Sequence, residues 1–193
     1  MKKHNPGRGY HNEFRIIAGA WRRRKLHFPP LPGIRPSPDR VRETLFNWLR
    51  ERVPGARCLD LFAGSGALGL EALSRGANSV TFVDREREAV EAIRGHLTLL
   101  EAADGDVTQA DALEWLKRAP EPYDIVFLDP PFASDLAELA LAALEAGGWL
   151  KPAALIYMEY AADVPPSLPA GWQLLRESRA GRVGFRLIQR QPG

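Results

Sequence analysis

Hydrophobic and polar residues recur along the chain with two periods, one typical of strands and one typical of helices. Short apolar runs, which predict strands, lie at residues 58–62, 80–83, 123–128 and 154–160, and the more polar residues 105–109 predict a further strand. Between them, apolar residues recur every three to four positions at residues 67–75, 86–100, 112–118 and 135–146. This alternation of strand and helix predicts an open α/β fold, a mostly parallel sheet with helices on both of its faces.

Both ends of the chain depart from this alternation. Residues 14–18 and 21–28 predict a β-hairpin, and the Ser-Pro-Asp at residues 37–39 predicts the start of a helix with Ser37 as its cap. Near the C-terminus, residues 173–177 and 184–189 predict a closing hairpin with an antiparallel edge strand. We therefore expect a flexible basic arm at residues 1–13, a hairpin and helix extension at residues 14–52, and the main domain at residues 53–193.

Composition limits the class of protein without naming its function. The chain has 193 residues, a single cysteine and four histidines, so neither a disulfide framework nor a zinc site is expected. The first residues are basic but lead into no apolar run, and no run is long enough to span a bilayer, so we expect neither a signal peptide nor a membrane segment. A cytoplasmic enzyme or binding protein is the resulting prediction.

The net charge of +2 hides an uneven distribution. Residues 1–40 carry ten Lys or Arg and two acidic residues, residues 41–171 carry eleven and twenty-one, and residues 172–193 carry five and one. Basic terminal segments are typical of nucleic-acid contacts, because each neutralised phosphate releases counterions. A solvated tail would have the same composition, so charge alone does not decide.

A glycine-rich turn between the first strand of the alternating region and the following helix predicts a ligand site. Gly64, Gly66 and Gly69 form a G-x-G-x-x-G pattern, and Asp84 follows about 20 residues later at the end of the next strand. In this layout the glycines let a ligand approach the backbone and the acid accepts hydrogen bonds from ribose hydroxyls. The pattern alone fits either NAD or an adenosyl ligand, and the glycines could merely close a tight turn while Asp84 caps a helix.

Asp60 favours the adenosyl ligand S-adenosylmethionine. It stands at the carboxyl end of the strand, just before the glycines, where a carboxylate would repel a pyrophosphate and attract an amino group and a sulfonium. Asp60 could instead stabilise the turn. Asp111 with Ala112 follows the third strand, where an acid could bind the adenine amino group or equally well cap a helix. The candidate cofactor-binding residues are Asp60, Phe62, Gly64, Gly66, Asp84, Arg85, Asp111 and Ala112.

The tetrad Asp129-Pro130-Pro131-Phe132 follows the fourth strand, so it is expected at the same edge of the sheet as the glycine loop. The two prolines have fixed φ angles and no N–H donor, which leaves an array of acceptors beside an aromatic ring. Such an array suits an exocyclic amine on a planar base: Asp129 and the Pro130 carbonyl accept its protons, and Phe132 stacks on the ring. The alternative is that the prolines end a strand and Phe132 packs in the core.

Four stretches resemble the bacterial 16S rRNA guanine-N2 methyltransferases that modify guanine 966. They are residues 15–26, residues 35–49, residues 60–77 and the tetrad at residues 129–132. The resemblance implies a class I methyltransferase (Rossmann-like) fold with a seven-stranded sheet and an N-terminal β-hairpin. It further implies S-adenosylmethionine as the methyl donor and 16S rRNA in the assembled small ribosomal subunit as the substrate, with residues 53–193 as the methyltransferase domain.

Given this resemblance, the basic ends would contact rRNA phosphates. The candidate RNA-binding residues are Arg22, Arg23, Arg24, Lys25, Arg35, Arg40, Arg42 and Arg182, with Arg179 as a further candidate. Arg40 or Arg42 could instead form an ion pair with Asp39 or Glu43 and be purely structural. We expect a monomer that needs no metal ion.

Three other functions remain open from the residues alone. An adenine-N6 DNA methyltransferase would use the same tetrad, but the chain has no obvious target-recognition domain. An NAD-dependent oxidoreductase would need a hydride-handling His or Tyr after the strands, and none is evident. A non-catalytic RNA-binding protein would not need the paired acids of the ligand site.

Overall fold

The computed structural model describes residues 12–30, 37–131 and 135–191. Its main feature is a seven-stranded sheet with the strand order β5-β4-β3-β6-β7-β9-β8. Strands β3 to β7 are parallel, and β9 runs antiparallel to both of its neighbours. The strands are β3 (Arg57–Asp60), β4 (Ser79–Asp84), β5 (Gly105–Gln109), β6 (Tyr123–Leu128), β7 (Leu150–Ala161), β8 (Trp172–Ala180) and β9 (Val183–Arg190). The predicted mostly parallel α/β fold is confirmed.

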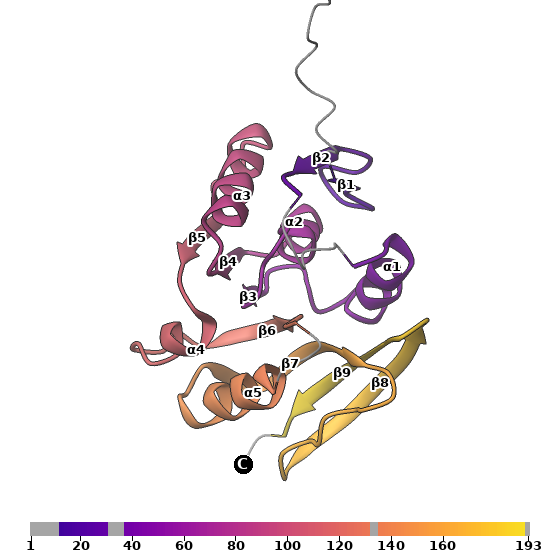
Figure 1. Ribbon diagram of the computed structural model, residues 1–193, viewed down its shortest axis with the longest axis vertical. Coiled ribbons are helices and arrows are strands. Elements are labelled where there is room, and N and C mark those ends of the chain that lie inside the picture. The colour runs from indigo at the N-terminus through magenta and orange to yellow at the C-terminus, as the bar shows by residue number, and fades with distance from the viewer. Residues whose placement is uncertain (1–11, 31–36, 132–134, 192–193) are drawn as a thin grey trace, which may run out of the picture.

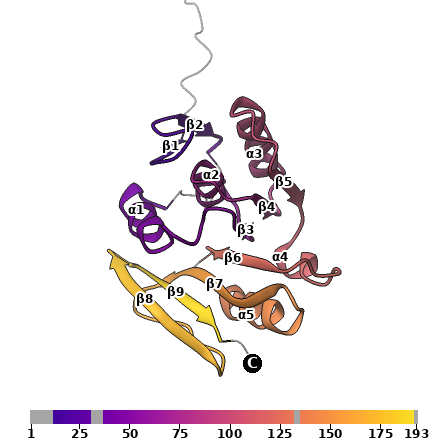
Figure 2. The same ribbon diagram turned by 180° about the vertical axis from the view of Figure 1, so that it is seen from behind.

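Helices cover both faces of this sheet (Figure 1). On one face lie α1 (Asp39–Trp48), α2 (Ala67–Ser74) and α3 (Arg87–Leu99), and on the other lie α4 (Ala112–Trp115) and α5 (Leu136–Ala146). The view from behind shows the same three layers (Figure 2). Successive residues of a strand point to opposite faces, so Cys58 and Leu59 of β3 belong to two different hydrophobic clusters.

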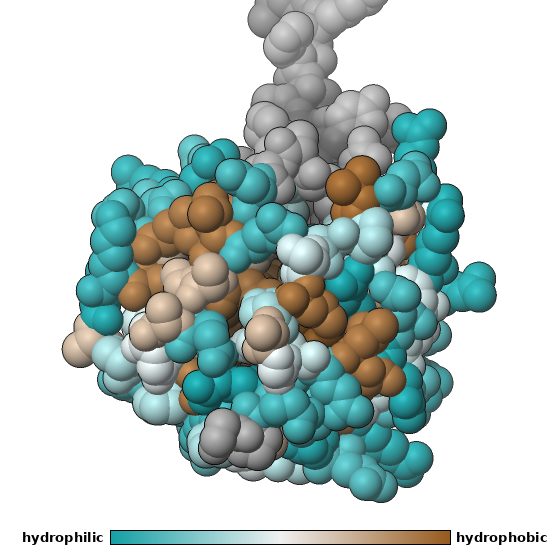
Figure 3. All heavy atoms as spheres, turned by 90° about the horizontal axis from the view of Figure 1, so that it is seen from below, coloured by the Kyte–Doolittle hydropathy of each residue, from teal (hydrophilic) through white to brown (hydrophobic). Residues whose placement is uncertain are grey.

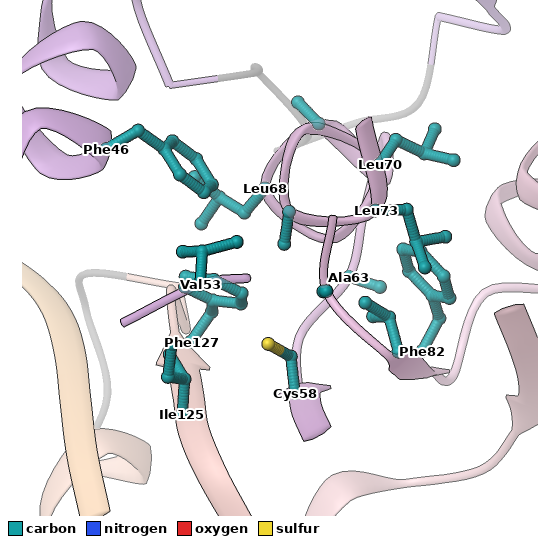
Figure 4. Close-up of a cluster of buried hydrophobic side chains, with 14 of the residues drawn as sticks. Phe46, Val53, Cys58, Ala63, Leu68, Leu70, Leu73, Phe82, Ile125 and Phe127 are labelled. Atoms are coloured by element: carbon teal, nitrogen blue, oxygen red, sulfur yellow. The ribbon is translucent and has the colours of Figure 1, made fainter. Parts of the chain in front are cut away.

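The larger cluster fills the space between the sheet and α1, α2 and α3. In Figure 4, Phe46 of α1 and Leu68 of α2 lie above Cys58 of β3 and Phe127 of β6. All eight residues of α2 are buried, because the sheet packs below this helix and the N-terminal hairpin above it. The core thus runs across residue 53, where the sequence suggests a boundary, and the division at that residue stays a prediction.

The N-terminal hairpin consists of β1 (Asn12–Arg15) and β2 (Lys25–Phe28), which pair antiparallel. Residues 21–24, predicted as part of the second strand, form a turn instead. The turn passes so close to α2 that a Cβ on Gly19 would lie 1.7 Å from the Ser74 carbonyl oxygen, and Gly19 has a φ of +85°. The predicted hairpin is confirmed, but the turn that joins its two strands is longer than predicted.

Several other elements differ from the predictions at their ends. Helix α4 is shorter than residues 112–118, and the strands of the C-terminal hairpin are longer than predicted because residues 181 and 182 turn the chain tightly. Helix α1 begins at Asp39 with no side-chain cap, so the prediction of Ser37 as its cap is wrong. The Ser37 hydroxyl is hydrogen-bonded to Glu159 instead.

The surface carries both hydrophobic and hydrophilic side chains. Figure 3 shows small groups of hydrophobic residues within a hydrophilic rim on the face seen from below. Within the described residues, no helix is both long and apolar enough to cross a membrane.

Candidate active site

The parallel strands bring four acidic residues to one edge of the sheet. Asp60 is the last residue of β3, Asp84 is the last of β4, Asp129 directly follows β6, and Glu159 lies near the end of β7. Strands β3, β4 and β6 are in register at this edge, where Asp60 pairs with Phe82 and with Phe127. Ligands of open α/β sheets bind outside the carboxyl ends of the strands, so this edge is the candidate active site.

The glycine loop joins β3 to α2 at this edge. Gly64 and Gly66 have φ angles of +51° and +77°, a conformation that favours glycine. The Gly64 N–H donates to Asp84 Oδ2 at 2.7 Å, so Asp84 already holds the loop. Gly69 serves the packing instead, because a Cβ there would lie 2.2 Å from the Phe82 ring and would push α2 away from β4. The tight turn that the pattern predicted is present, the packing role of Gly69 was not predicted, and the approach of a ligand to the glycines stays a prediction.

Asp60 is a buried carboxyl group beside this loop. It accepts the N–H of Gly69 at 3.0 Å, and 2% of the residue is exposed. Burial, followed by the negative charge of Asp84, raises the pKa of Asp60 from 3.8 to about 7 in spite of that hydrogen bond. A cation bound beside Asp60 would remove this cost, so the residue suits a ligand with a positive amino or sulfonium group.

The remaining cofactor candidates surround the ends of β4 and β5. Asp84 Oδ1 accepts the Glu86 N–H at 2.8 Å, and Arg85 forms an exposed ion pair with Glu86. Asp111 caps α4, since its Oδ1 accepts two backbone N–H groups. Phe62 is half-buried against the smaller hydrophobic cluster, and Ala112 is buried in it. The structure brings these residues to one edge, and their contacts with a ligand stay predictions.

Asp129 and Pro130 lie in the candidate active site, whereas Phe132 lies outside the described residues. Asp129 is half-buried, Pro130 is buried and Pro131 is exposed. Burial of the Asp129 carboxyl group raises its pKa well above the usual range, and the charges of Glu159 and Asp60 raise it further. Asp129 thus binds a proton more readily than an exposed aspartate does, and it is a full acceptor only when ionised.

Sequence reasoning missed three residues that surround Asp129. Glu159 is 3% exposed, its Oε1 accepts a hydrogen bond of 2.7 Å from the Tyr157 hydroxyl, and the Ser37 hydroxyl also contacts that oxygen. The negative charge of Glu159 raises the pKa of Asp129, whereas the Ser37 hydroxyl lowers it. The available signal was Glu159 itself, a charged residue inside an apolar run that was predicted as a buried strand.

The candidate RNA-binding residues divide into three groups. Arg42 is fully buried and donates to Asp39 Oδ1 at 2.6 Å, so its prediction as a phosphate contact is wrong. The alternative ion pair with Asp39 is the one formed, because α1 turns the Arg42 side chain inward toward Glu71. Arg35 lies outside the described residues. The exposed candidates are Arg22, Arg23, Arg24, Lys25, Arg40, Arg179 and Arg182.

The exposed candidates lie at different distances from the candidate active site. Arg40 is three residues from Ser37, and the Arg182 carbonyl accepts the N–H of Ala162, just beyond Glu159. The turn that carries Arg22 packs on Ser74 at the end of α2, whereas the glycine loop lies at the start of α2. An eight-residue helix is about 12 Å long, so this turn is at least that far from the loop.

No group of His, Cys, Asp or Glu within the described ranges is arranged to hold a metal ion. The only cysteine, Cys58, is buried in β3, and burial raises the pKa of its thiol. Neither observation assigns a metal-dependent chemistry to the site.

Comparison with known proteins places this geometry in a family. Residues 14–189 match the family described as conserved hypothetical protein 95. The chain is 47% identical over 192 residues to ribosomal RNA small subunit methyltransferase D of Escherichia coli K12, covering 99% of this chain and 96% of that protein. It is 46% identical to the protein of the same name from Haemophilus influenzae, over 92% of this chain and 94% of that protein.

A solved structure agrees with these relatives. The putative methyltransferase yhhF from Escherichia coli superimposes with a TM-score of 0.86 at 47% identity, covering 94% of this chain and all of that one. The chain therefore belongs to the conserved hypothetical protein 95 family, in which its near full-length relatives include ribosomal RNA small subunit methyltransferase D.

Proposed function

We propose that the protein is a 16S rRNA methyltransferase that transfers the methyl group of S-adenosylmethionine to the exocyclic N2 amine of guanine 966. The observation that supports this most directly is the position of Asp129 and Pro130, at the same sheet edge as the glycine loop and Asp60. One edge then offers an acceptor pair for an amine and a site for a cationic nucleoside. The near full-length relatives are named as methyltransferases of ribosomal RNA.

The acceptor pair can activate a weak nucleophile. The lone pair of an exocyclic amine is delocalised into the base, so the amine attacks poorly unless its geometry changes. The Asp129 carboxylate and the Pro130 carbonyl would accept its two N–H groups, which favours positive charge on the nitrogen and aims its lone pair. Phe132 would stack on the base.

The acidic residues around the glycine loop fit S-adenosylmethionine. That ligand supplies an electrophilic methyl group on a sulfonium and also carries a positive amino group. Asp60 would bind next to the positive charge, Asp84 would accept from the ribose hydroxyls, and Asp111 would accept from the adenine amine. The raised pKa of Asp60 in the free protein agrees with a carboxyl group that lacks its cationic partner.

The exposed basic residues suit a large anionic substrate. Arg40 and Arg182 would bind phosphates near the target base, and Arg22, Arg23, Arg24 and Lys25 would bind phosphates farther away. Guanine in a folded rRNA must turn outward to reach the site, which costs a few kcal/mol and explains a need for contacts beyond the base. We propose that the substrate is rRNA in the assembled small subunit and that the protein acts as a monomer in the cytoplasm.

Transfer of labelled methyl groups to small subunits that lack the modification tests this function. We expect label in 16S rRNA, and mass mapping of its fragments should locate the new methyl group on N2 of guanine 966. Asp129→Asn should lower the transfer rate at least about 100-fold, because it removes the charged acceptor. The same variant should still bind S-adenosylhomocysteine, measured by calorimetry.

Duplex DNA serves as the competing substrate. Label in adenine of the DNA with none in rRNA would replace the proposal by an adenine-N6 DNA methyltransferase. Undiminished transfer by Asp129→Asn would reject the role of Asp129.

A further inference from the structure

A pocket with a volume of about 330 Å³ opens where the C-terminal hairpin meets the end of β7. Two of its lining residues lie in β8 and one lies in β9, and the others belong to the end of β7 and the loop that follows it. The lining residues used below are Tyr160, Ala162, Pro165, Glu177, Arg179 and Gly184. The chemistry proposed above uses none of them.

The pocket lies at the same sheet edge as the candidate active site. Strand β9 is antiparallel to both β7 and β8, so β8 ends at the edge where β6 and β7 end. In Figure 1 the arrows of β6 and β8 point to the same side of the molecule. Asp129 directly follows β6, and β9 is the second strand along from β6, which is about 10 Å at the usual spacing of strands. An RNA strand bound at Asp129 can therefore also reach the pocket.

The pocket and the Asp129 site open toward opposite faces of β7. Tyr160 belongs to the smaller hydrophobic cluster, next to α4 and α5, whereas Tyr157 belongs to the larger cluster on the other face. Glu159 shares the face of Tyr157, because residues two positions apart in a strand point the same way. A base in the pocket is therefore a different base from the one at Asp129.

Glu177 supplies a fixed carboxylate to this pocket. Its Oε1 accepts a hydrogen bond of 2.6 Å from the Tyr160 hydroxyl and lies 3.4 Å from Arg186 Nη2. Tyr160 and Arg186 are buried, whereas the Glu177 side chain is 46% exposed. Both contacts fall on Oε1, and no donor among the described residues is bonded to Oε2. One oxygen of a carboxylate that is already held in place is thus open to a ligand.

The groups that hold Glu177 are themselves built into the sheet. The Arg186 guanidinium lies 4.4 Å from the centre of the Tyr160 ring, and its Nη1 donates to the Pro166 carbonyl at 3.0 Å. Gly184 lets the ring lie close to β9, since a Cβ there would be 2.5 Å from it. Within the described part of the chain, the Nε of Arg186 has no partner and Glu177 is its only acidic partner. A buried cation spent on one half-exposed carboxylate adds little stability, which favours a binding role for that carboxylate.

The donors and acceptors of the bases decide which base suits this pocket. An ionised carboxylate only accepts, and guanine presents two adjacent donors, N1–H and the N2 amine. Adenine, cytosine and uracil place an acceptor beside their N–H groups, which Glu177 would repel. Ala162 and Pro165 offer apolar surface to the ring. The Arg179 side chain is 62% exposed, with Asp163 at 3.8 Å, so it is available to a phosphate.

We propose that this pocket binds a second, unstacked guanine nucleotide of the RNA substrate, near the target in the same RNA. Glu177 accepts the N–H groups of this base, and Arg179 binds its phosphate. Recognition of RNA sequence depends on such splayed-out bases, because their edges are free for hydrogen bonds. The inference rests on the proposed function for the RNA, and it adds a base-binding site away from Asp129.

Nucleotide binding to the free protein tests the pocket without methyl transfer. With ¹³C-labelled tyrosine, the Tyr160 ring resonance is assigned by its loss in Tyr160→Phe. We expect guanosine 5′-monophosphate to shift this resonance and to bind at least about tenfold more tightly than uridine 5′-monophosphate. Glu177→Gln should lose this preference, and Ala162→Leu, which fills the pocket, should lose the binding. Glu114→Gln, at an exposed acid of α4 that pairs with Lys117, is the matched control and should behave as the wild type.

Methyl transfer to small subunits that lack the modification completes the test. Glu177→Gln and Ala162→Leu should each lower kcat/KM for the subunits at least about tenfold, while urea unfolding of Glu177→Gln stays close to that of the wild type. A purely structural role of Glu177 predicts the reverse, a less stable protein with unchanged kcat/KM. The proposal would be overturned by that result, by equal binding of the two nucleotides, or by a Tyr160 resonance that neither nucleotide shifts. Failure of the proposed function would look different: no transfer to rRNA, with guanosine 5′-monophosphate still bound in the pocket.

Discussion

At the scale of single residues, Asp60 shows how a ligand site can lower the stability of the protein that contains it. Folding buries its carboxyl group and raises its pKa from 3.8 to about 7. The folded state therefore binds this proton more tightly than the unfolded state does. The free energy of unfolding must fall as the pH rises from about 4 to about 7, and above that range the full penalty is present.

Asp60→Asn should remove this penalty. Asparagine keeps an acceptor for the Gly69 N–H but carries no charge, so at pH 8 we expect the free energy of unfolding to rise by roughly 2–4 kcal/mol. The gain should shrink as the pH is lowered toward 4, which urea unfolding at several pH values would measure.

The same variant should lose most of its affinity for S-adenosylmethionine. Asp104→Asn is the control and should change neither quantity, because Asp104 is an exposed acid just before β5, two strands away from β3. A lower free energy of unfolding for Asp60→Asn at pH 8 would contradict this account. It would show that the ionised carboxylate stabilises the fold even without a bound cation.

At the scale of elements, the N-terminal hairpin is attached to α2 through one buried carboxylate. Glu71 is fully buried in α2 and accepts the backbone N–H groups of Ile17 at 2.8 Å and Ala18 at 3.0 Å. It also pairs with Arg75 at 2.6 Å and lies 3.7 Å from Arg42. Two backbone N–H groups and two arginine side chains thus surround the Glu71 carboxylate.

Glu71→Ala should destabilise the protein by about 3–5 kcal/mol, because it removes one of the two carboxylates that face the buried Arg42 charge and leaves two N–H groups without their acceptor. Urea unfolding measures the loss, and hydrogen exchange should show the hairpin opening before the sheet. The control is Glu91→Ala, which breaks an exposed ion pair with Arg87 and should cost no more than about 0.5 kcal/mol. Equal losses in the two variants would contradict this account.

The elements also show what the sequence could predict. The glycine loop, the acid after each strand and the alternation of faces follow local rules, so their positions were predictable. The inward turn of Arg42 depends on how α1 packs beside α2, where Glu71 lies 3.7 Å away. The contact between Ser37 and Glu159 joins residues 122 positions apart. No local pattern marks such a partner, and for this reason Ser37 was assigned to a helix cap and Arg42 to RNA.

At the scale of the whole molecule, the basic residues occupy two regions with different distances to the acidic edge. The turn that carries Arg22, Arg23 and Arg24 lies at the far end of α2. Arg40 is three residues from Ser37, which contacts Glu159, and the Arg182 carbonyl accepts the N–H of Ala162, three residues beyond Glu159. A phosphate contact far from the target base can contribute to binding but does not orient the amine. The two regions should therefore differ in which step of the reaction they affect.

Replacing Arg22, Arg23 and Arg24 by alanine should weaken binding to small subunits and leave the single-turnover rate at saturation unchanged. Each lost phosphate contact should reduce the slope of log affinity against log salt concentration by about 0.7 to 0.9. Arg40→Ala with Arg182→Ala should reduce the slope and also slow the transfer step, because those contacts hold the RNA beside the acceptor pair. Arg118→Ala, an exposed arginine beyond α4 on the opposite face of the sheet, should change neither. A contradicting outcome would be that the variant at Arg22, Arg23 and Arg24 slows the transfer step at saturation as much as the variant at Arg40 and Arg182. Distance from the acidic edge would then not decide the role of a basic residue, and the two regions would have to act as one surface.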